Sequence, residues 1–389
     1  MTSDKRRGLP DARRAAKQSR SRPKRRRRSL FRSLLRLFVM WVAVVVLGSA
    51  IFIGSKCYSS TEPAAATTAP AGADGLPGYV RAEVFTYLTL PEWYIVYSAD
   101  EYAASIAQRP PSAFPYVGAA RQYWGYYSAA CGVTERSYPF ETGYHVMLGV
   151  IGASFTLENT IKTVYENTVG RMTEWLSSTD TPEDAFARRV AKEYGAFMHT
   201  VPWYQFPFAS RLAELWRETP LRGPHTLRKV ERRVLLTAEY GAKAVYGWLI
   251  GKASGAAYAG EELRIYARID HATTAVFTDP RVKQVRSLGP GAYLVTLPRY
   301  EEFTRTALAM NALGIRFLDI AGNDEILITV LARRGTSREV PYARLVAAKS
   351  ILTDPTMQRL AFTIPVSSLR DVSEHLAREH AVIEHLYDY

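Results

Sequence analysis

The sequence predicts an α+β protein that one N-terminal helix holds in a membrane, and three observations support this fold class. Residues 37–55 form an uncharged run of 19 residues. Residues 79–260 show helical periodicity and many aromatic side chains, whereas residues 261–389 alternate short β-branched runs with helical patterns. We therefore expect a transmembrane helix, a mainly helical aromatic-rich subdomain and a C-terminal ferredoxin-like α+β sandwich.

The net charge of the chain comes from its first 36 residues. The sequence contains 50 Lys+Arg and 37 Asp+Glu, a formal net charge of +13. Residues 1–36 hold 15 of the basic and two of the acidic residues, which accounts for all of this charge and leaves 35 of each sign elsewhere. The neutral body is therefore not predicted to bind nucleic acid. The tail lacks apolar periodicity and is expected to be disordered.

Residues 37–55 have the length of a membrane-spanning helix. At about 1.5 Å per residue they cover roughly 28 Å, close to the ~30 Å thickness of a hydrocarbon core. Trp41 and Tyr58 lie near the two ends, where aromatic side chains favour the membrane interface. A cleaved signal peptide is the alternative, but its apolar region usually has only about 7–15 residues. We expect an uncleaved signal-anchor.

The basic residues beside this run predict its orientation. Only Lys56 follows the run closely, so the positive-inside rule places residues 1–36 in the cytoplasm and the body in the periplasm, across the inner membrane. These residues are also expected to contact anionic headgroups, while a nuclear signal or nucleic-acid patch is the alternative for residues 24–28. They are Lys24, Arg25, Arg26, Arg27, Arg28, Arg32 and Arg36.

Residues 56–78 are predicted to be a flexible linker, because 59–75 contain only Ser, Thr, Glu, Pro, Ala, Gly and Asp. The chain has two cysteines, Cys57 at the end of the apolar run and Cys131 in the body. In an oxidising compartment they can pair with each other, or Cys57 can pair with its copy in a second protomer. Two cysteines without a histidine nearby in the sequence do not predict a metal site, and no cofactor is predicted.

Two helix starts in the helical subdomain carry capping residues. Thr89 and Glu92 have the spacing of a capping box, with Pro91 in the first turn. Thr181 and Asp184 mark a second start, where acidic residues favour the positive end of the helix dipole. Glu92 is therefore interpreted as a cap rather than as a catalytic acid.

A predicted helix over 143–170 carries polar and small residues on one face, because they recur at spacings of three and four. These residues are His145, Gly149, Gly152, Thr156, Asn159 and Thr163. Two interpretations stay open. The face lines a polar cleft with His145, Thr156, Asn159 and Thr163 as candidate site residues, or it forms a close helix contact whose hydrogen bonds are satisfied.

Aromatic residues make up 14 of the 56 residues between 85 and 140. This composition suits a bilayer interface, a protein interface, a sugar-stacking platform or a core with a wet edge. Residues 228–258 are predicted to form one long helix that ends in a row of small residues, Gly247, Gly251, Gly255 and Ala259. Lys243 and Lys252 interrupt its apolar character. Whether 235–259 touches or crosses the membrane stays open, with an interfacial or tightly packed helix as the default.

The C-terminal subdomain is predicted to contain two similar halves. Thr296-Leu297-Pro298 and Thr363-Ile364-Pro365 each follow an apolar strand and precede a helix, at an offset of 67 residues. Two β-α-β halves on one antiparallel sheet make a ferredoxin-like sandwich. Asn323-Asp324 resembles a hairpin turn between two strands. The candidate strands are 263–269, 292–297, 316–320, 326–331, 359–364 and 382–386, and the candidate helices are 299–313 and 367–380.

No sequence motif predicts a reaction. The chain has no phosphate-binding loop, nucleophile elbow or zinc-protease motif, and His375, His380 and His385 have the wrong spacing for one metal-binding helix face. The leading hypothesis is an interaction or assembly component of a membrane complex. Its expected partners are the membrane, other membrane or envelope proteins, and a second copy of the chain. The alternatives are an envelope hydrolase with a cleft near His145 and Asn159, and a ligand-binding sensor on a membrane anchor.

Overall fold

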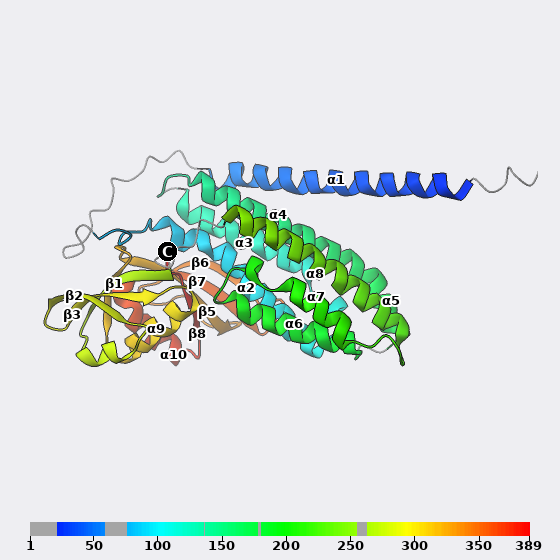
Figure 1. The fold of residues 1–389 in the computed structure, drawn as a ribbon. Helices are drawn as coiled ribbons and strands as arrows, with labels where there is room; N and C mark the ends of the chain where they lie inside the picture. The colour runs from blue at the N-terminus through cyan, green and yellow to red at the C-terminus, as the bar shows by residue number, and fades with distance from the viewer. Residues whose placement is uncertain (1–21, 59–75, 136, 178–179, 255–262) are drawn as a thin grey trace, which may run out of the picture.

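The computed structural model describes residues 22–58, 76–135, 137–177, 180–254 and 263–389. Helices α2 to α8 gather at one end of the molecule, and all the strands lie at the other end together with α9 and α10 (Figure 1). The predicted α+β class is confirmed, with antiparallel strands throughout both sheets.

The elements follow the sequence in two blocks. The helices are α1 (Arg22–Lys56), α2 (Val84–Gln108), α3 (Tyr116–Thr134), α4 (Thr142–Tyr165), α5 (Arg171–Leu176), α6 (Pro182–Met198), α7 (Phe208–Glu218), α8 (Thr226–Ser254), α9 (Glu301–Ala312) and α10 (Leu369–Arg378). The strands are β1 (Arg264–Asp270), β2 (Lys283–Gly289), β3 (Ala292–Pro298), β4 (Arg316–Ile320), β5 (Glu325–Arg333), β6 (Arg344–Ser350), β7 (Met357–Pro365) and β8 (Val382–Leu386).

Helix α1 contains the only segment of the described residues that is long and apolar enough to cross a membrane. That segment is Val39–Lys56, with a mean hydropathy of 1.9, and only 6 % of it is buried in the protein. The helix begins at Arg22, inside the tail that we expected to lack structure. Lys and Arg are good helix formers, so an apolar helix can continue through them. Residues 1–21 and most of the predicted linker, 59–75, lie outside the described residues.

The predicted start at Thr89 is wrong, whereas the start at Thr181 is correct. Helix α2 begins at Val84 and carries Pro91 in its interior, so Glu92 lies in mid-helix and caps nothing. The apolar run that precedes Thr89 already continues the helical pattern, and the Thr89 hydroxyl donates to the Phe85 carbonyl, 3.0 Å away. Thr181, in contrast, caps α6 in a capping box with Asp184.

The strands form two four-stranded sheets with the same order, β2-β3-β1-β4 and β6-β7-β5-β8. Each sheet uses three consecutive strands, one helix and a fourth strand, and the predicted repeat marks the ends of β3 and β7. The single ferredoxin-like sheet is not confirmed. Two edge strands were missed because their side chains are largely exposed and show no apolar alternation, and they are β2 and β6.

The segment around Asn323-Asp324 is not a hairpin between partners in one sheet. It carries the chain from β4 in the first sheet to β5 in the second. The two sheets share one apolar core with α9 and α10. The second sheet is buried on both faces, since Leu327, Ala361 and Tyr387 pack into the aromatic core of α2 and α3. This sheet therefore joins the helical half to the sheet half.

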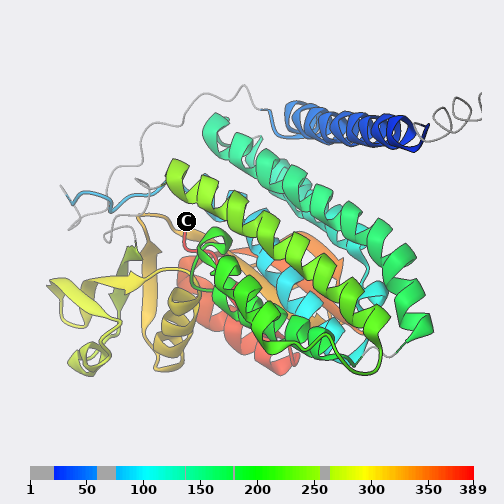
Figure 2. The same ribbon diagram turned by 45° about the vertical axis from the view of Figure 1, so that its right-hand side comes forward.

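Helices α4 and α8 run side by side along the outside of the helical half (Figure 2). The C-terminal end of α1 rests against the start of α4 and against α3. The ring centroids of Phe52 and Trp124 are 4.9 Å apart, and a Cβ added at Gly149 would lie 2.7 Å from Cδ1 of Ile53. Glycine at this position permits the close approach of α1 and α4.

Candidate functional site

The predicted polar row on α4 packs against other helices along most of its length. His145 is buried, its ring stacks on Phe140 with centroids 4.4 Å apart, and its Nδ1 lies 2.8 Å from the Tyr127 hydroxyl. Trp124 donates its indole N–H to the Thr156 hydroxyl at 2.9 Å. These contacts occupy the functional groups of His145 and Thr156 in helix packing.

The other two predicted site residues bond within their own helix. Asn159 donates to the Phe155 carbonyl at 2.8 Å, and the Thr163 hydroxyl donates to the Asn159 carbonyl at 2.7 Å. Of the four candidate residues, Asn159 lines the cavity that is described below, and the other three do not. The structure thus does not bring the four together in one cleft.

A disulfide joins Cys57 at the end of α1 to Cys131 near the end of α3, and both residues are buried. The bond closes a loop across 74 positions of sequence. The two sulfur atoms and a ring nitrogen of His145 all lie within 4.8 Å of one another. Because the sulfurs are bonded to each other, they offer no thiolate ligands to a metal in this state.

A cavity of about 100 Å³ lies inside the helical half, among α2, α4, α6 and α8. Its walls are aromatic and apolar apart from Asn159, several tyrosine hydroxyls and four charged side chains. The charged residues are Glu158, Lys162, Glu239 and Lys243.

These four residues form a closed ring of ion pairs between α4 and α8. Nζ of Lys162 lies 3.0 Å from Glu158 and 2.9 Å from Glu239, and Nζ of Lys243 lies 2.9 Å from Glu158 and 3.0 Å from Glu239. The Lys162 ammonium also lies 5.0 Å from the centre of the Tyr102 ring. Each charge has two opposite neighbours, so the ring is neutral as a whole. Lys162, Glu239 and Lys243 are largely buried, whereas the Glu158 side chain is 38 % exposed.

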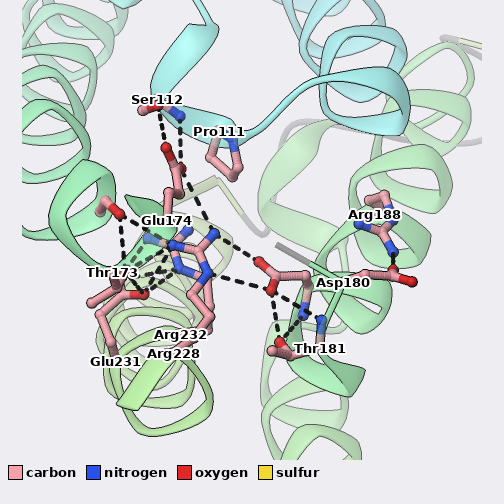
Figure 3. Close-up of polar contacts among 12 residues, drawn as sticks. Pro111, Ser112, Thr173, Glu174, Asp180, Thr181, Arg188, Arg228, Glu231 and Arg232 are labelled. Carbon is pink, nitrogen blue, oxygen red and sulfur yellow. Dashed lines mark hydrogen bonds and ion pairs between the residues drawn. The ribbon is translucent and has the colours of Figure 1, made fainter. Parts of the chain in front are cut away.

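A second set of charges surrounds the fully buried Arg228, farther towards the start of α8 (Figure 3). Its guanidinium lies 2.8 Å from Asp184 of α6 and 3.2 Å from Glu231, and it donates to Thr173 at 3.0 Å. Glu174 of α5 lies 3.7 Å away and accepts a hydrogen bond from the Ser112 hydroxyl. One arginine therefore ties α5, α6 and α8 together.

Arg232 lies one turn farther along α8 and pairs with Glu166 through two bonds of 3.0 and 2.9 Å. Glu166 begins a π-helical turn, Glu166–Gly170, between α4 and α5. A Cβ at Gly170 would lie 2.3 Å from Oε2 of Glu166, so only glycine leaves room for this carboxylate. Such turns insert an extra residue into a helix and often mark functional positions.

Arg233 completes the set, because its guanidinium lies 2.7 Å from Glu183 and also donates to Thr219. These charges form three separate networks along α8, which together we call the ionic column. It comprises Glu158, Lys162, Glu166, Glu174, Glu183, Asp184, Arg228, Glu231, Arg232, Arg233, Glu239 and Lys243.

The opposite side of the same two helices is apolar and exposed. Within 142–170 and 226–251, both of which the structure describes completely, no charged residue is classed as exposed. We call this surface the outer face. It comprises Val146, Met147, Val150, Ile161 and Val164 of α4, and Leu227, Val230, Val234, Val245, Tyr246, Trp248 and Leu249 of α8. Both helices therefore turn their charges inward and their apolar side chains outward.

Polar groups also line the contact between the helical half and the second sheet. Arg359 of β7 pairs with Glu384 at 2.6 Å and Glu101 at 3.1 Å. Arg359 is buried, so both carboxylates pair with an interior cation. Tyr97 of α2 lies 2.9 Å from the Thr329 hydroxyl of β5. These bonds hold the two halves at a fixed register.

Histidines lie at one end of this contact. Nε2 of His199 lies 2.7 Å from Asp100, and Nδ1 lies 3.5 Å from Glu301 of α9, so these two carboxylates raise the pKa of His199 to about 9. His385 is fully buried beneath Trp93, with ring centroids 3.6 Å apart, and burial holds its pKa well below the usual value. His385 is therefore neutral and part of the core.

Glu92 is a titratable residue that the capping interpretation missed. Burial raises its pKa to about 7, although a hydrogen bond from Tyr144 and the charge of Arg299 partly oppose the shift. One of its carboxylate oxygens has no hydrogen-bond partner among the described residues. Glu92 does not line the cavity between α4 and α8.

These contacts describe two helices, α4 and α8, whose charges face other helices and whose exposed side chains are mainly apolar. Comparison with protein-family models, with curated proteins and with solved structures found no match to this chain.

Proposed function

We propose that the protein is a single-pass, membrane-anchored interaction or assembly component of a membrane complex, with its body on the extracytoplasmic side. The anchor is α1, whose apolar segment has the length of a bilayer core. Basic residues precede this segment in the sequence, which favours a cytoplasmic N-terminus at the inner membrane. The buried disulfide favours an oxidising compartment for the body.

The single observation that carries this function is the outer face. Soluble proteins rarely expose a contiguous apolar surface of more than a few hundred Å², and a larger one marks a site of contact with a membrane or with another protein. Val150 is 54 % exposed, Val234 is 62 % exposed and Val245 is 61 % exposed, on two adjacent helices of which α4 contacts the anchor. The body is therefore suited to work in contact with other components of the membrane, at a position that the disulfide fixes relative to α1.

Topology is tested with reporter fusions after Gly75 and after Tyr389. Both are expected to give an extracytoplasmic signal, and a cytoplasmic signal from either one contradicts the single-pass arrangement. In intact cells, the two cysteines are expected to resist a thiol reagent until a reductant is added. Reaction without reductant contradicts the oxidising compartment.

The assembly role is tested by cross-linking in cells, purification in a mild detergent and identification of the proteins recovered. The matched control is residues 1–58 with Cys57→Ser, which keep the tail and α1 without the body. We expect defined membrane proteins with the full chain and not with the control. Recovery of the full chain alone, together with hydrolysis of an envelope substrate, overturns the assembly role.

The hydrolase alternative loses the site on which it was based. His145 and Asn159 are 14 residues apart on one straight helix, which is roughly 21 Å along its axis, so they do not act on one bond. The sensor alternative has one observation in its favour, the cavity with the four-charge ring. Stabilisation of the purified protein by a small zwitterionic compound, lost in Lys162→Met, would support it.

A further inference from the structure

We propose that the outer face of α4 and α8 contacts the acyl chains of the bilayer in which α1 is anchored. The proposal rests on the membrane anchorage proposed above and goes beyond it, because it assigns part of the body to the lipid. The occupant is inferred from the composition of the face, its borders and its position beside α1.

The composition of the outer face fits lipid better than protein. Protein interfaces carry about one hydrogen bond per 100–200 Å², and therefore need polar groups within them. On α8 the exposed positions between Thr226 and Gly251 are Leu227, Val230, Val234, Ala238, Ala242, Val245, Tyr246, Trp248 and Leu249. Acyl chains form no hydrogen bonds. A helix whose charges all face the protein interior presents a surface to them that needs none.

Exposed charges occur at both ends of the face. The ion pairs of Glu158 with Lys243 and of Lys162 with Glu239 show that α4 and α8 run antiparallel, and the last turn of α1 contacts the first turns of α4. The cations Lys56 and Lys252 therefore lie towards the end of the face where α4 begins, and Arg171 lies towards the other end.

The neighbouring helix α6 shows how a water-facing surface of this protein is built. Its outward positions include Arg189 and Lys192, both exposed, among small residues. Its inward positions, such as Phe186 and Val190, are apolar and buried. Although α6 also buries Glu183 and Asp184, it exposes charges on its outward side, whereas the exposed positions of α4 and of α8 up to Gly251 carry none.

The test is nitroxide scanning of the full-length protein in vesicles of phosphatidylethanolamine and phosphatidylglycerol. Labels are placed through Val150→Cys, Val234→Cys and Val245→Cys, and the native cysteines do not react because they are bonded to each other. The matched controls are Ala196→Cys on α6 and Val285→Cys on β2, both exposed. Power saturation compares collisions with oxygen, which concentrates in lipid, and with a polar nickel chelate, which stays in water.

We expect oxygen collisions to exceed chelate collisions at the three outer-face sites, with the reverse at both controls. Equal or higher chelate collisions at the outer face show that it lies in water and overturn the proposal. Labels that are shielded from both reagents show a protein partner or a second copy on the face and also overturn it. Circular dichroism and the mobility of the disulfide-bonded form on a non-reducing gel confirm that each variant is folded.

The outcomes separate this proposal from the assembly function. Shielded labels together with recovered partner proteins contradict the lipid contact and support assembly. Lipid-exposed labels with no recovered partner contradict assembly and support the lipid contact.

Discussion

The sheet half differs from the helices α4 and α8 in the side chains that it exposes. In the sheet half, apolar side chains such as Ile269 and Phe362 fill the core, and exposed charged pairs such as Arg370 with Glu374 accompany the buried Arg359. In the helices α4 and α8, Arg228 and Arg232 are buried while Val234 is exposed. One chain is thus built for two surroundings, and the buried second sheet marks the change between them.

The difference shows why the helical half tolerates so many interior charges. A buried ion pair is costly to desolvate and contributes little net stability compared with apolar packing. In a protein surrounded by water, such a pair is therefore less favourable than apolar packing. Where the surroundings of the helix are apolar, a charge has a lower free energy facing the protein interior than facing outward. The ionic column and the outer face are two aspects of one arrangement.

The largest expected effect comes from Arg228→Met. The variant leaves Asp184, Glu231 and Glu174 without their buried cation, which should lower the free energy of unfolding by about 3–5 kcal/mol. The matched control, Arg370→Met in the sheet half, removes an exposed i,i+4 pair and should cost about 0.3–0.5 kcal/mol. Thermal unfolding of both variants measures the contrast, and equal losses would contradict the difference between the halves.

Val234→Asp tests the outer face in the same way. A charge placed in an apolar membrane environment costs about 2.5–3.5 kcal/mol at the centre of a helix, so the variant should be recovered from membranes in reduced yield. Val285→Asp on β2 makes the same change at an exposed position and should stay within about 0.5 kcal/mol of the parent. If Val234→Asp is equally neutral, the outer face is an ordinary wet surface.

His199→Gln tests the contact between the halves through its pH dependence. The folded pKa of about 9 lies above the ordinary value of 6.5, so pairing with Asp100 and Glu301 stabilises the protein fully below pH 6.5. This contribution is lost as the pH rises through 9. The variant should be less stable by about 1 kcal/mol at pH 6, and melting curves of the two proteins should converge near pH 10. A constant difference across this range would contradict the assigned charge.

The smallest effect is expected for Glu92→Gln, and it has the opposite sign. Burial raises the folded pKa from 4.5 to about 7, so the parent loses stability as the pH rises through this interval. The variant should therefore melt higher than the parent at pH 8 and equally at pH 4.5. A higher melting temperature of the variant at both pH values would indicate a packing effect instead.

Local patterns in the sequence predicted the parts of the fold that depend on neighbouring residues. The start of α6 at Thr181, the apolar segment of α1 and the repeat that ends β3 and β7 all follow from short motifs. The strands β2 and β6 were missed because an edge strand with exposed side chains has no apolar alternation. Without β2 and β6, the sequence pattern does not distinguish two four-stranded sheets from one ferredoxin-like sheet.

The ionic column was missed for a more general reason. A helix with one charged and one apolar face has the same periodicity whichever face is buried. The spacing of Arg228, Arg232, Glu239 and Lys243 therefore places these charges on one side of α8 without saying that this side is the interior. Only the partners supplied by α4, α5 and α6 settle the direction, and those contacts are distant in sequence. The polar row that contains His145 and Asn159 was ambiguous in another way. Polar residues on one helix face show the same sequence pattern whether they line a cleft or pack against another helix.

The π-helical turn at Glu166–Gly170 changes the direction in which side chains face between α4 and α5, although the helix continues through it. Before the turn, Glu158 and Lys162 belong to the four-charge ring. After the turn, Thr173 and Glu174 face Arg228. Each residue advances an α-helix by about 100°. Deleting a single residue from this turn would therefore rotate α5 away from Arg228 without touching any side chain that binds it, so the length of this short turn is as constrained as the charges on either side.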